Sequence, residues 1–179
     1  MPIPPSHHSI RLAECEGLLP VLKLVVEAIE RRIDARGRKR IRLGLQRMPD
    51  RVLAYHVVGS NLIVLNERML HKVKAASKGN KVLVNSYLYH VILHEYLHML
   101  GILDERRVSE LVCYVCEREL GPDHPATLMS KYGLRAILPE LGVKVPLDDD
   151  WSDNVKLLRG EDQVVYMEAF EGRIERCKL

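Results

Sequence analysis

Hydrophobic positions in the first third of the chain follow two different periods. From Ile10 to about Arg36 they recur at the spacing of one helix face, at Leu12, Leu18, Leu19, Leu22, Val25, Val26, Ile29 and Ile33. This spacing predicts one long amphipathic helix, or two helices joined near Pro20, ending at Gly37. From residue 39 onward KRIRLGLQRM alternates apolar and polar residues, and RVLAYHVVG and NLIVLN are rich in strand-forming residues. Turn signals separate these runs, so we expect three strands of a small sheet.

Further helices are predicted after these strands. Residues 67–76 show a short helical pattern, and Asn85 with Ser86 are expected to cap a helix carrying YLYHVILHEYLHMLGILDE, residues 87–105. Another helix is predicted from about Asp104 to Leu120, and ATLMSKYG, residues 126–133, is expected to form a short helix or a turn. We therefore predict an α+β fold, with a small mixed sheet packed on the long N-terminal helix and on the helix of residues 87–105.

The two ends of the chain differ in composition from its middle. MPIPPSHHS is rich in proline and is expected to form a flexible start. VPLDDDWSDN is interpreted as an acidic linker, and QVVYMEAFEGRIERCKL as a last strand with a charged tail. We predict a flexible N-terminus at residues 1–9, one domain at residues 10–141 and a C-terminal extension at residues 142–179.

Composition narrows the class of protein. The 179 residues are 47% hydrophobic and 28% charged, which fits a globular protein with room for one domain and its core. A net charge of +3 is too small to indicate a nucleic-acid partner by itself. The sequence shows neither the layout of a signal peptide nor a membrane-spanning run, and its four cysteines do not form a secreted disulfide framework. We therefore expect a cytoplasmic protein without a membrane association.

The segment of residues 87–105 contains titratable side chains that an apolar core does not accept without compensation. Within it, His94, Glu95 and His98 form the motif HExxH. Histidines four residues apart lie on one face of a helix, one turn apart, so both imidazoles can bind one metal ion. Glu95 points about a quarter turn away, where it can hold a metal-bound water instead of the metal. The motif therefore predicts a Zn²⁺ site.

The motif and its surroundings resemble the zincin metallopeptidases. HEYLHMLGILD is similar to the longer HExxHxxGxxH/D signature of the metzincin clan, in which Gly101 would turn the chain and Asp104 would be the third ligand. The resemblance covers about residues 11–138. It implies a zincin-like fold with the HExxH helix between a sheet and a second helical layer, an edge strand NLIVLN that aligns an extended substrate, and a Met-turn at Met129 followed by Tyr132. The segment also resembles small archaeal proteins that carry LLHEYLH followed by DH and AT, a resemblance that implies no activity.

Three residues are candidates for the third metal ligand. Asp104 has the metzincin offset, but an aspartate before a helix is also an ordinary N-cap. His124, in the turn GPDHP beside Asp123, can be a ligand, a donor to the transition state or an exposed loop histidine. Glu110 suits a glutamate-type zincin, although its separation from His98 is shorter than in that family.

Other polar groups have simpler interpretations. Cys113 and Cys116 can bind metal or be redox active, but no second cysteine pair completes a zinc knuckle, which favours structural thiols. The basic run RRIDARGRKRIR lacks interleaved aromatic residues, so a solvated helix end is favoured over nucleic-acid binding. His90, one turn before His94, is interpreted as a core histidine in preference to a pocket residue.

The sequence thus predicts a zinc-dependent metallopeptidase that acts on a peptide or protein substrate. The two histidines of HExxH, with Asp104 or His124, would hold Zn²⁺, and Glu95 would take a proton from the zinc-bound water and pass it to the leaving amine. Tyr132, or His124 if it is not a ligand, would stabilise the oxyanion. The alternative is a catalytically inactive protein of the same fold that serves as a binding module for a protein or a nucleic acid.

Overall fold

The computed structural model describes residues 5–33, 40–142, 151–158, 164–168 and 174–178. The described helices are α1 (His7–Glu14), α2 (Leu18–Arg32), α3 (Glu67–Ala76), α4 (Lys81–Met99), α5 (Glu105–Leu120) and α6 (Pro125–Tyr132), with 3₁₀ turns at Leu134–Ala136 and Pro139–Gly142. The described strands are β1 (Arg42–Gln46), β2 (Val52–Val57), β3 (Leu62–Asn66), β4 (Asn154–Leu158), β5 (Val164–Glu168) and β6 (Ile174–Lys178). The predicted α+β class is confirmed, as are the three early strands and the helix of residues 67–76.

The strands form one mixed sheet in the order β5-β4-β1-β3-β2-β6. β1 and β3 are parallel, whereas the other neighbouring strands are antiparallel. β3 pairs with β1 along one edge and with β2 along the other, so β3 is an interior strand. The prediction that NLIVLN is an edge strand is therefore wrong, and β2, on the outer side of β3, pairs with β6 instead.

Strands from beyond the predicted domain boundary at residue 141 belong to this same sheet. β4 pairs with β1, and Gly44 makes the close approach possible, because a Cβ at this position would lie only 2.7 Å from Cγ1 of Val155. β6 pairs with β2 at the opposite side of the sheet. Residue 141 is therefore not a boundary of the sheet. At the other end, the helix α1 begins at His7, inside the segment predicted to be flexible.

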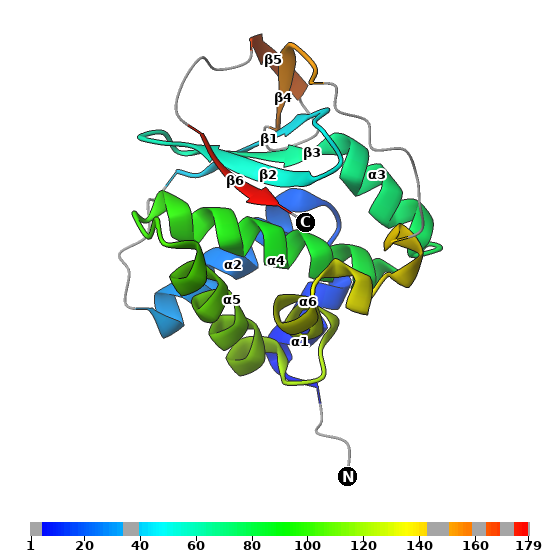
Figure 1. The fold of residues 1–179 in the computed structure, drawn as a ribbon. Coiled ribbons are helices and arrows are strands. Elements are labelled where there is room, and N and C mark those ends of the chain that lie inside the picture. Colours follow the sequence, from blue (N-terminus) through cyan, green and yellow to red (C-terminus); the bar gives the residue numbers. More distant parts are fainter. Residues whose placement is uncertain (1–4, 34–39, 143–150, 159–163, 169–173, 179) are drawn as a thin grey trace.

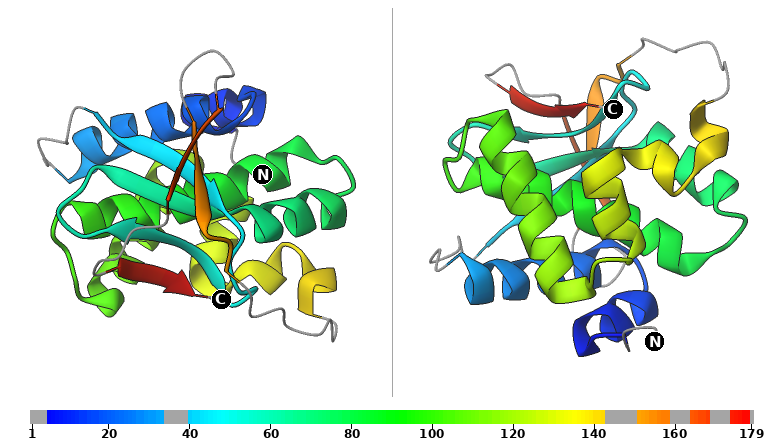
Figure 2. Two further views of the ribbon diagram at one scale, coloured as in Figure 1. Left: turned by 90° about the horizontal axis from the view of Figure 1, so that it is seen from above. Right: turned by 60° about the horizontal axis from the view of Figure 1, so that its bottom comes forward.

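Helix α4 is the centre of the helical side of the molecule. It packs against β2 and β3, and α1, α2, α5 and α6 pack around it, as Figures 1 and 2 show. The main core lies between these helices and the sheet. The opposite face of the sheet buries a second, smaller apolar cluster, made of Met48, Val52, Tyr55, Val57, Leu62, Val64, Val155 and Leu157. Burial on both faces explains why β2 and β3 are nearly continuous apolar runs.

The N-terminal helical pattern is divided into two helices. Helix α1 ends at Glu14 and α2 begins at Leu18, with Gly17 at a φ of 85° between them, a conformation that favours glycine. Pro20 lies in the first turn of α2, where a backbone N–H would have no partner within the helix. The break therefore precedes the proline. The predicted stop at Gly37 lies outside the described residues.

Helix α4 begins earlier than the sequence predicts. Asn80 is its N-cap, and the Asn80 side chain accepts hydrogen bonds from the backbone N–H groups of Val82 and Leu83. Asn85 lies inside the helix and is buried; its amide donates to the carbonyl oxygens of Leu12 (2.8 Å) and Cys15 (3.0 Å) at the end of α1. The predicted capping role of Asn85 and Ser86 is thus wrong, because this amide instead fastens α1 to α4.

The apolar character of α4 fits its interior position. Nearly every residue from Asn85 to Met99 is buried, so the helix has apolar neighbours on all sides. None of the helices in the described ranges combines the length and apolar composition needed to span a membrane.

Candidate metal centre

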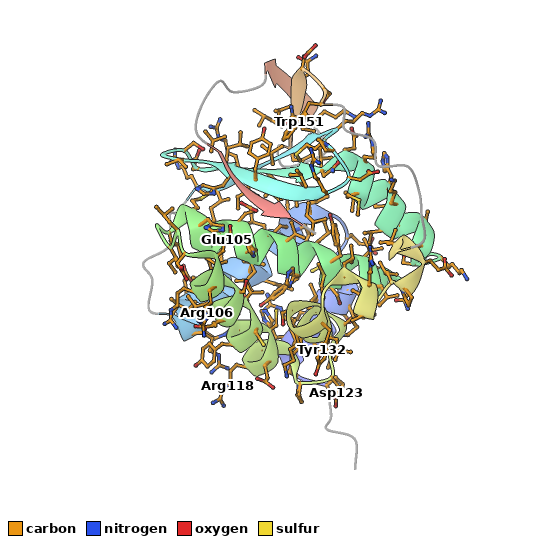
Figure 3. The ribbon with its side chains drawn as sticks, viewed as in Figure 1. Glu105, Arg106, Arg118, Asp123, Tyr132 and Trp151 are labelled. Carbon is orange, nitrogen blue, oxygen red and sulfur yellow. The ribbon has the colours of Figure 1, made fainter. Side chains whose placement is uncertain are left out.

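Helix α4 places the two histidines of HExxH side by side in the core. His94 and His98 are buried, and their Nε2 atoms lie 3.1 Å apart. Glu105, the first residue of α5, completes the group: its carboxylate oxygens lie 3.3 Å from Nε2 of His94 and 3.2 Å from Nε2 of His98. All three possible ligand atoms lie within 4.8 Å of one another. Figure 3 labels Glu105 where α5 begins beside α4. We call these three residues the metal-site cluster.

The metal-site cluster has dimensions that fit a tetrahedral zinc ion. Ligand atoms about 2.0–2.1 Å from a tetrahedral centre lie about 3.4 Å from one another. The two Nε2 atoms are 3.1 Å apart, and each lies 3.2–3.3 Å from a different oxygen of the Glu105 carboxylate. Two imidazoles and one carboxylate are a donor set of catalytic zinc sites, which leave the fourth position to water or substrate. The side chain of Glu105 is 58% exposed, so solvent reaches the cluster from this side.

The turn after α4 orients the second histidine. Gly101 adopts a φ of 95°, and its N–H donates to the carbonyl oxygen of His98 (2.9 Å). The turn brings the carbonyl oxygen of Ile102 to 2.8 Å from Nδ1 of His98. A proton on Nδ1 donates to this carbonyl, so Nε2 carries the lone pair that faces the cluster. The predicted turn at Gly101 is confirmed, and it leaves Nε2 as the nitrogen of His98 that could bind a metal ion.

The first histidine is held in its neutral form. Burial, with smaller contributions from the charges of His90 and His98, lowers the pKa of His94 to about 3. A neutral imidazole is the form that binds a metal ion, because protonation removes the lone pair. His94 is therefore able to bind metal throughout the neutral and mildly acidic range.

Glu95 and a histidine from the sheet lie beside the cluster. Glu95 is fully buried, and one of its carboxylate oxygens lies 3.6 Å from Nδ1 of His56 on β2. The ring of His56 is nearly parallel to that of His98, with the centroids 5.8 Å apart. Sequence reasoning missed His56. The available signal was a single histidine within the apolar strand RVLAYHVVG, at a position that alternation places on the same face as Ala54 of the main core.

The structure gives two of the predicted third ligands other partners. Asp104 is the N-cap of α5, and its carboxylate accepts a hydrogen bond from the backbone N–H of Arg107 (2.6 Å). Glu110 pairs with Arg106 (3.3 Å) and Arg107 (3.6 Å) along the exposed side of α5. The carboxylate that reaches the histidines is that of Glu105, which sequence reasoning did not consider.

Three residues from the region after α5 also lie elsewhere. His124 is the N-cap of α6: its Nδ1 accepts from the N–H of Ala126 (3.2 Å), and burial, aided by the charge of His8, lowers its pKa to about 4. Tyr132 ends α6 with 72% of its surface exposed, and Figure 3 labels it away from Glu105. Met129, predicted in a Met-turn, is a helical residue of α6 in the main core. Neither His124 nor Tyr132 joins the metal-site cluster.

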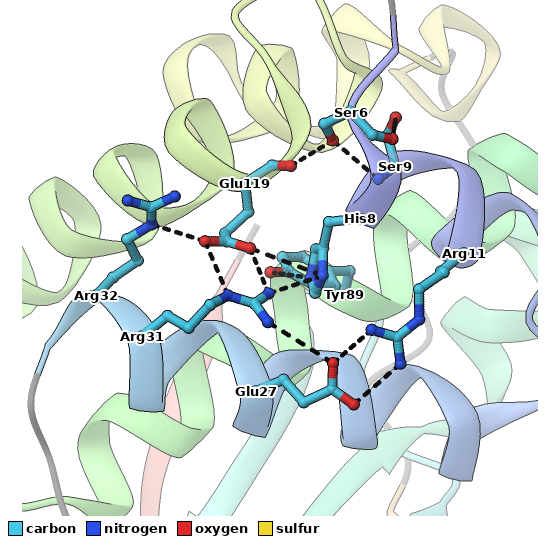
Figure 4. Close-up of polar contacts among 9 residues, drawn as sticks. All are labelled: Ser6, His8, Ser9, Arg11, Glu27, Arg31, Arg32, Tyr89 and Glu119. Carbon is cyan, nitrogen blue, oxygen red and sulfur yellow. Dashed lines mark hydrogen bonds and ion pairs between the residues drawn. The ribbon is translucent and has the colours of Figure 1, made fainter.

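A second charged cluster lies at the other end of α5 (Figure 4). The side chain of Glu119, only 3% exposed, accepts hydrogen bonds from Arg31 (2.5 Å) and Arg32 (2.6 Å) of α2. Arg31 also contacts Nδ1 of His8 (3.0 Å), whose Nε2 lies 3.2 Å from the hydroxyl of Tyr89. We call these five residues the Glu119 network. Two arginines of the predicted basic run are thus engaged in it, and residues 34–39 of that run lie outside the described residues.

Two other predicted groups lie within the helices, with Cys116 fully buried and His90 partly buried. Burial raises the pKa of the Cys116 thiol on α5 well above its usual range, which fits an unreactive structural cysteine. Burial lowers the pKa of His90 to about 4. Both residues therefore stay uncharged at neutral pH, as expected for core positions.

The chain matches no protein-family model, and neither a curated protein nor a solved structure matches it.

Proposed function

We propose that this chain is a zinc-dependent peptidase. The observation that carries the proposal is the convergence of Nε2 of His94, Nε2 of His98 and the carboxylate of Glu105 at tetrahedral spacing, with the buried Glu95 directly after the first histidine. Three protein ligands and a half-exposed side fit a catalytic zinc site better than a closed structural one. Peptides are the proposed substrate class because HEYLHMLGILD resembles the metzincin signature and because a strand, β2, lies directly beside the cluster.

A zincin-like arrangement is part of this proposal. It is supported by α4, which packs against the sheet on one side and against α5 and α6 on the other, and by the turn at Gly101. The chain departs from the metzincin pattern at the third ligand, where Glu105 takes the place expected for Asp104. We propose zinc ligation by His94, His98 and Glu105.

The chain's own residues would divide the reaction between them. Zn²⁺ in this site would supply a Lewis acid that polarises the substrate carbonyl and lowers the pKa of water. Glu95 would accept the proton of the attacking water and return it to the leaving amine. His56, 3.6 Å from the carboxylate of Glu95, would hold that carboxylate in one orientation against the cluster. Ile102 would keep His98 in the tautomer that binds metal through Nε2.

Glu95→Gln tests the proposal, because the amide keeps the size of the side chain and cannot accept the proton. We expect the variant to retain zinc at wild-type stoichiometry and to lose about 10²–10⁴-fold in kcat on quenched fluorescent peptides. Glu110→Gln, a change on the exposed side of α5, is the matched control and should retain both zinc and turnover. Full activity in Glu95→Gln would contradict the role of Glu95. Zinc binding by the wild type without turnover of any peptide would favour the binding-module alternative.

A further inference from the structure

Strand β6 lies against the part of the sheet that borders the metal-site cluster. Its backbone pairs antiparallel with β2, and Glu175 is the residue opposite His56. His56 in turn contacts Glu95 and stacks on His98. β6 also packs against α4, and Figure 1 shows this strand between β2 and α4. The backbone of β6 therefore lies next to His56, the residue that contacts the side chains of the proposed reaction.

The edge of β2 is the place where an extended peptide would best reach the cluster. Sheet edges bind extended peptides through main-chain hydrogen bonds, which require an unpaired row of N–H and C=O groups. One edge of β2 pairs with β3 and the other pairs with β6. A neighbouring strand lies about 4.8 Å away, so a substrate strand and β6 cannot occupy the same edge of β2 at once.

We propose that β6 is an autoinhibitory strand: it occupies the edge of β2 on which a peptide substrate must pair, and it has to leave β2 before the metal-site cluster can act on that peptide. The proposal rests on the proposed peptidase function for the identity of the ligand. The blocked edge itself follows from the strand pairing alone.

The composition and pairing of β6 fit a strand that can be displaced. Its sequence, IERCK, has three charged residues among five, whereas all residues of β2 are buried. The pairing is also irregular, with a register shift between Val52 and Ala54. The backbone hydrogen bonds of a short strand at a sheet edge are ones that a competing peptide strand can replace. β1 pairs with β3 and β3 pairs with β2. The departure of β6 therefore leaves these three strands paired.

An engineered, reducible disulfide can hold β6 on β2 and so test the proposal. Ala54 on β2 is the register partner of Cys177 on β6, and directly opposed residues in antiparallel strands lie about 4.5–5.5 Å apart, within the range for a disulfide. In the full chain, Ala54→Cys should therefore crosslink to Cys177 under mild oxidation. The matched control is Ala54→Cys combined with Cys177→Ser, which carries the same change in β2 and cannot form the bond. Failure of Ala54→Cys to crosslink would overturn the proposal, because the pairing it rests on would be wrong.

Two readouts then report whether the strand blocks the edge. The first is turnover of quenched fluorescent peptides by zinc-loaded protein, before and after reduction with a phosphine. The second is independent of catalysis: binding of a fluorescein-labelled peptide EGRIERSKL, which copies residues 171–179 with serine in place of Cys177. We expect the oxidised lock to lose at least about tenfold in both readouts and to recover on reduction, with no change in the control. Equal peptide binding by the locked and reduced forms would overturn the proposal.

Two double proline variants test the effect of releasing β6 from β2, instead of holding it there. Successive backbone N–H groups of a strand point to opposite edges, so Ile174→Pro with Arg176→Pro and Glu175→Pro with Cys177→Pro remove N–H groups from opposite sides of β6. The double variant that loses its hydrogen bonds to β2 should bind the labelled peptide at least about tenfold more tightly than the wild type, whereas the other should resemble the wild type. Wild-type binding by both would contradict displacement.

The two readouts separate this proposal from the proposed function. Equal turnover in the locked and reduced forms would reject autoinhibition and leave the peptidase assignment standing. Lock-dependent peptide binding without turnover in any form would reject the peptidase assignment and leave β6 as the occupant of a peptide-binding edge.

Discussion

Helix α5 carries a glutamate at each end that meets a histidine, and the two glutamates differ in the charge of their other partners. At the C-terminal end, the carboxylate of Glu119 is almost fully buried and is met by Arg31 and Arg32. At the N-terminal end, the carboxylate of Glu105 is half exposed, and its ion-pair partners among the described residues are the imidazoles of His94 and His98.

The difference separates a structural ion-pair network from the cluster that we propose to bind zinc. In the Glu119 network the protein supplies the positive charges itself, so the carboxylate is compensated without a ligand. In the metal-site cluster the histidine next to the carboxylate is neutral, because the pKa of His94 is lowered to about 3 by its burial. The carboxylate of Glu105 and the two Nε2 atoms lie together there, and a bound metal ion would compensate the negative charge and accept the imidazole lone pairs.

The largest effect that distinguishes the two clusters is expected for His98→Ala. Structural zinc sites bind with about 10–16 kcal/mol, or roughly 3 kcal/mol for each of four ligands, so the loss of one ligand should weaken zinc binding by at least about 100-fold. Titration with a chromophoric zinc chelator measures this change. His71→Ala, at an exposed position of α3, is the control that should bind zinc like the wild type. Unchanged affinity in His98→Ala would mean that the cluster is not the metal site.

Glu119→Gln should break the other cluster and leave the first unaffected. The change leaves two guanidinium groups without their carboxylate, but Arg31 and Arg32 are partly exposed and regain water. We therefore expect a loss of about 2 kcal/mol in the free energy of unfolding by urea, with unchanged zinc affinity. Glu27→Gln removes partly exposed ion pairs with Arg11 (2.6 Å) and Arg31 (3.8 Å) and should cost less than about 1 kcal/mol. Equal costs for the two variants would argue against the special role of the buried carboxylate.

A smaller effect should separate two adjacent acidic residues. Glu105→Gln keeps one oxygen donor and removes the negative charge, so zinc affinity should fall by about tenfold. Asp104→Asn should bind zinc like the wild type, because asparagine is also a good N-cap and the Asp104 side chain serves that role. The reverse order of affinities in the same titration would restore Asp104 as the third ligand.

The smallest expected effect is the response of the Glu119 network to acid. The pKa of His8 is lowered, mainly by burial, with the charge of Glu119 opposing and that of Arg31 assisting the shift. Below the ordinary value of 6.5 the unfolded chain therefore binds a proton more readily than the folded one. The stability from neutral His8 is complete above that pH and is lost as pH falls further. In metal-free protein, urea unfolding at pH 7 and pH 5 should show a larger decrease for the wild type than for His8→Gln.

Much of the fold near the sheet could be predicted because local patterns determine it. Alternation and turn residues located β1 to β3, and the helical pattern of residues 67–76 matches α3 to the residue. The placement of β4 and β6 could not be predicted in this way. Their partners lie far along the chain, and β4 depends on the space that the missing side chain of Gly44 leaves for Val155.

The candidate site was predictable where one helix supplies it and not where elements meet. The four-residue spacing of His94 and His98 sufficed to place both imidazoles together. The third ligand depends on how α5 begins: because the side chain of Asp104 is used as the cap, the next residue, Glu105, is the one that faces the histidines. N-cap preference pointed to this outcome, but the distance across the turn at Gly101 is a property of the folded chain.

The pairing of β6 with β2 also has a consequence for the order in which the molecule is assembled during translation. β2 ends at Val57 and its outer partner begins only at Ile174, so at 5–20 residues per second the ribosome needs on the order of ten seconds to deliver that partner. Through this interval β1, β2, β3 and the HExxH helix can already be in place. Until β6 is synthesised, β2 is an unpaired edge of the sheet, the kind of surface that pairs with other chains most readily.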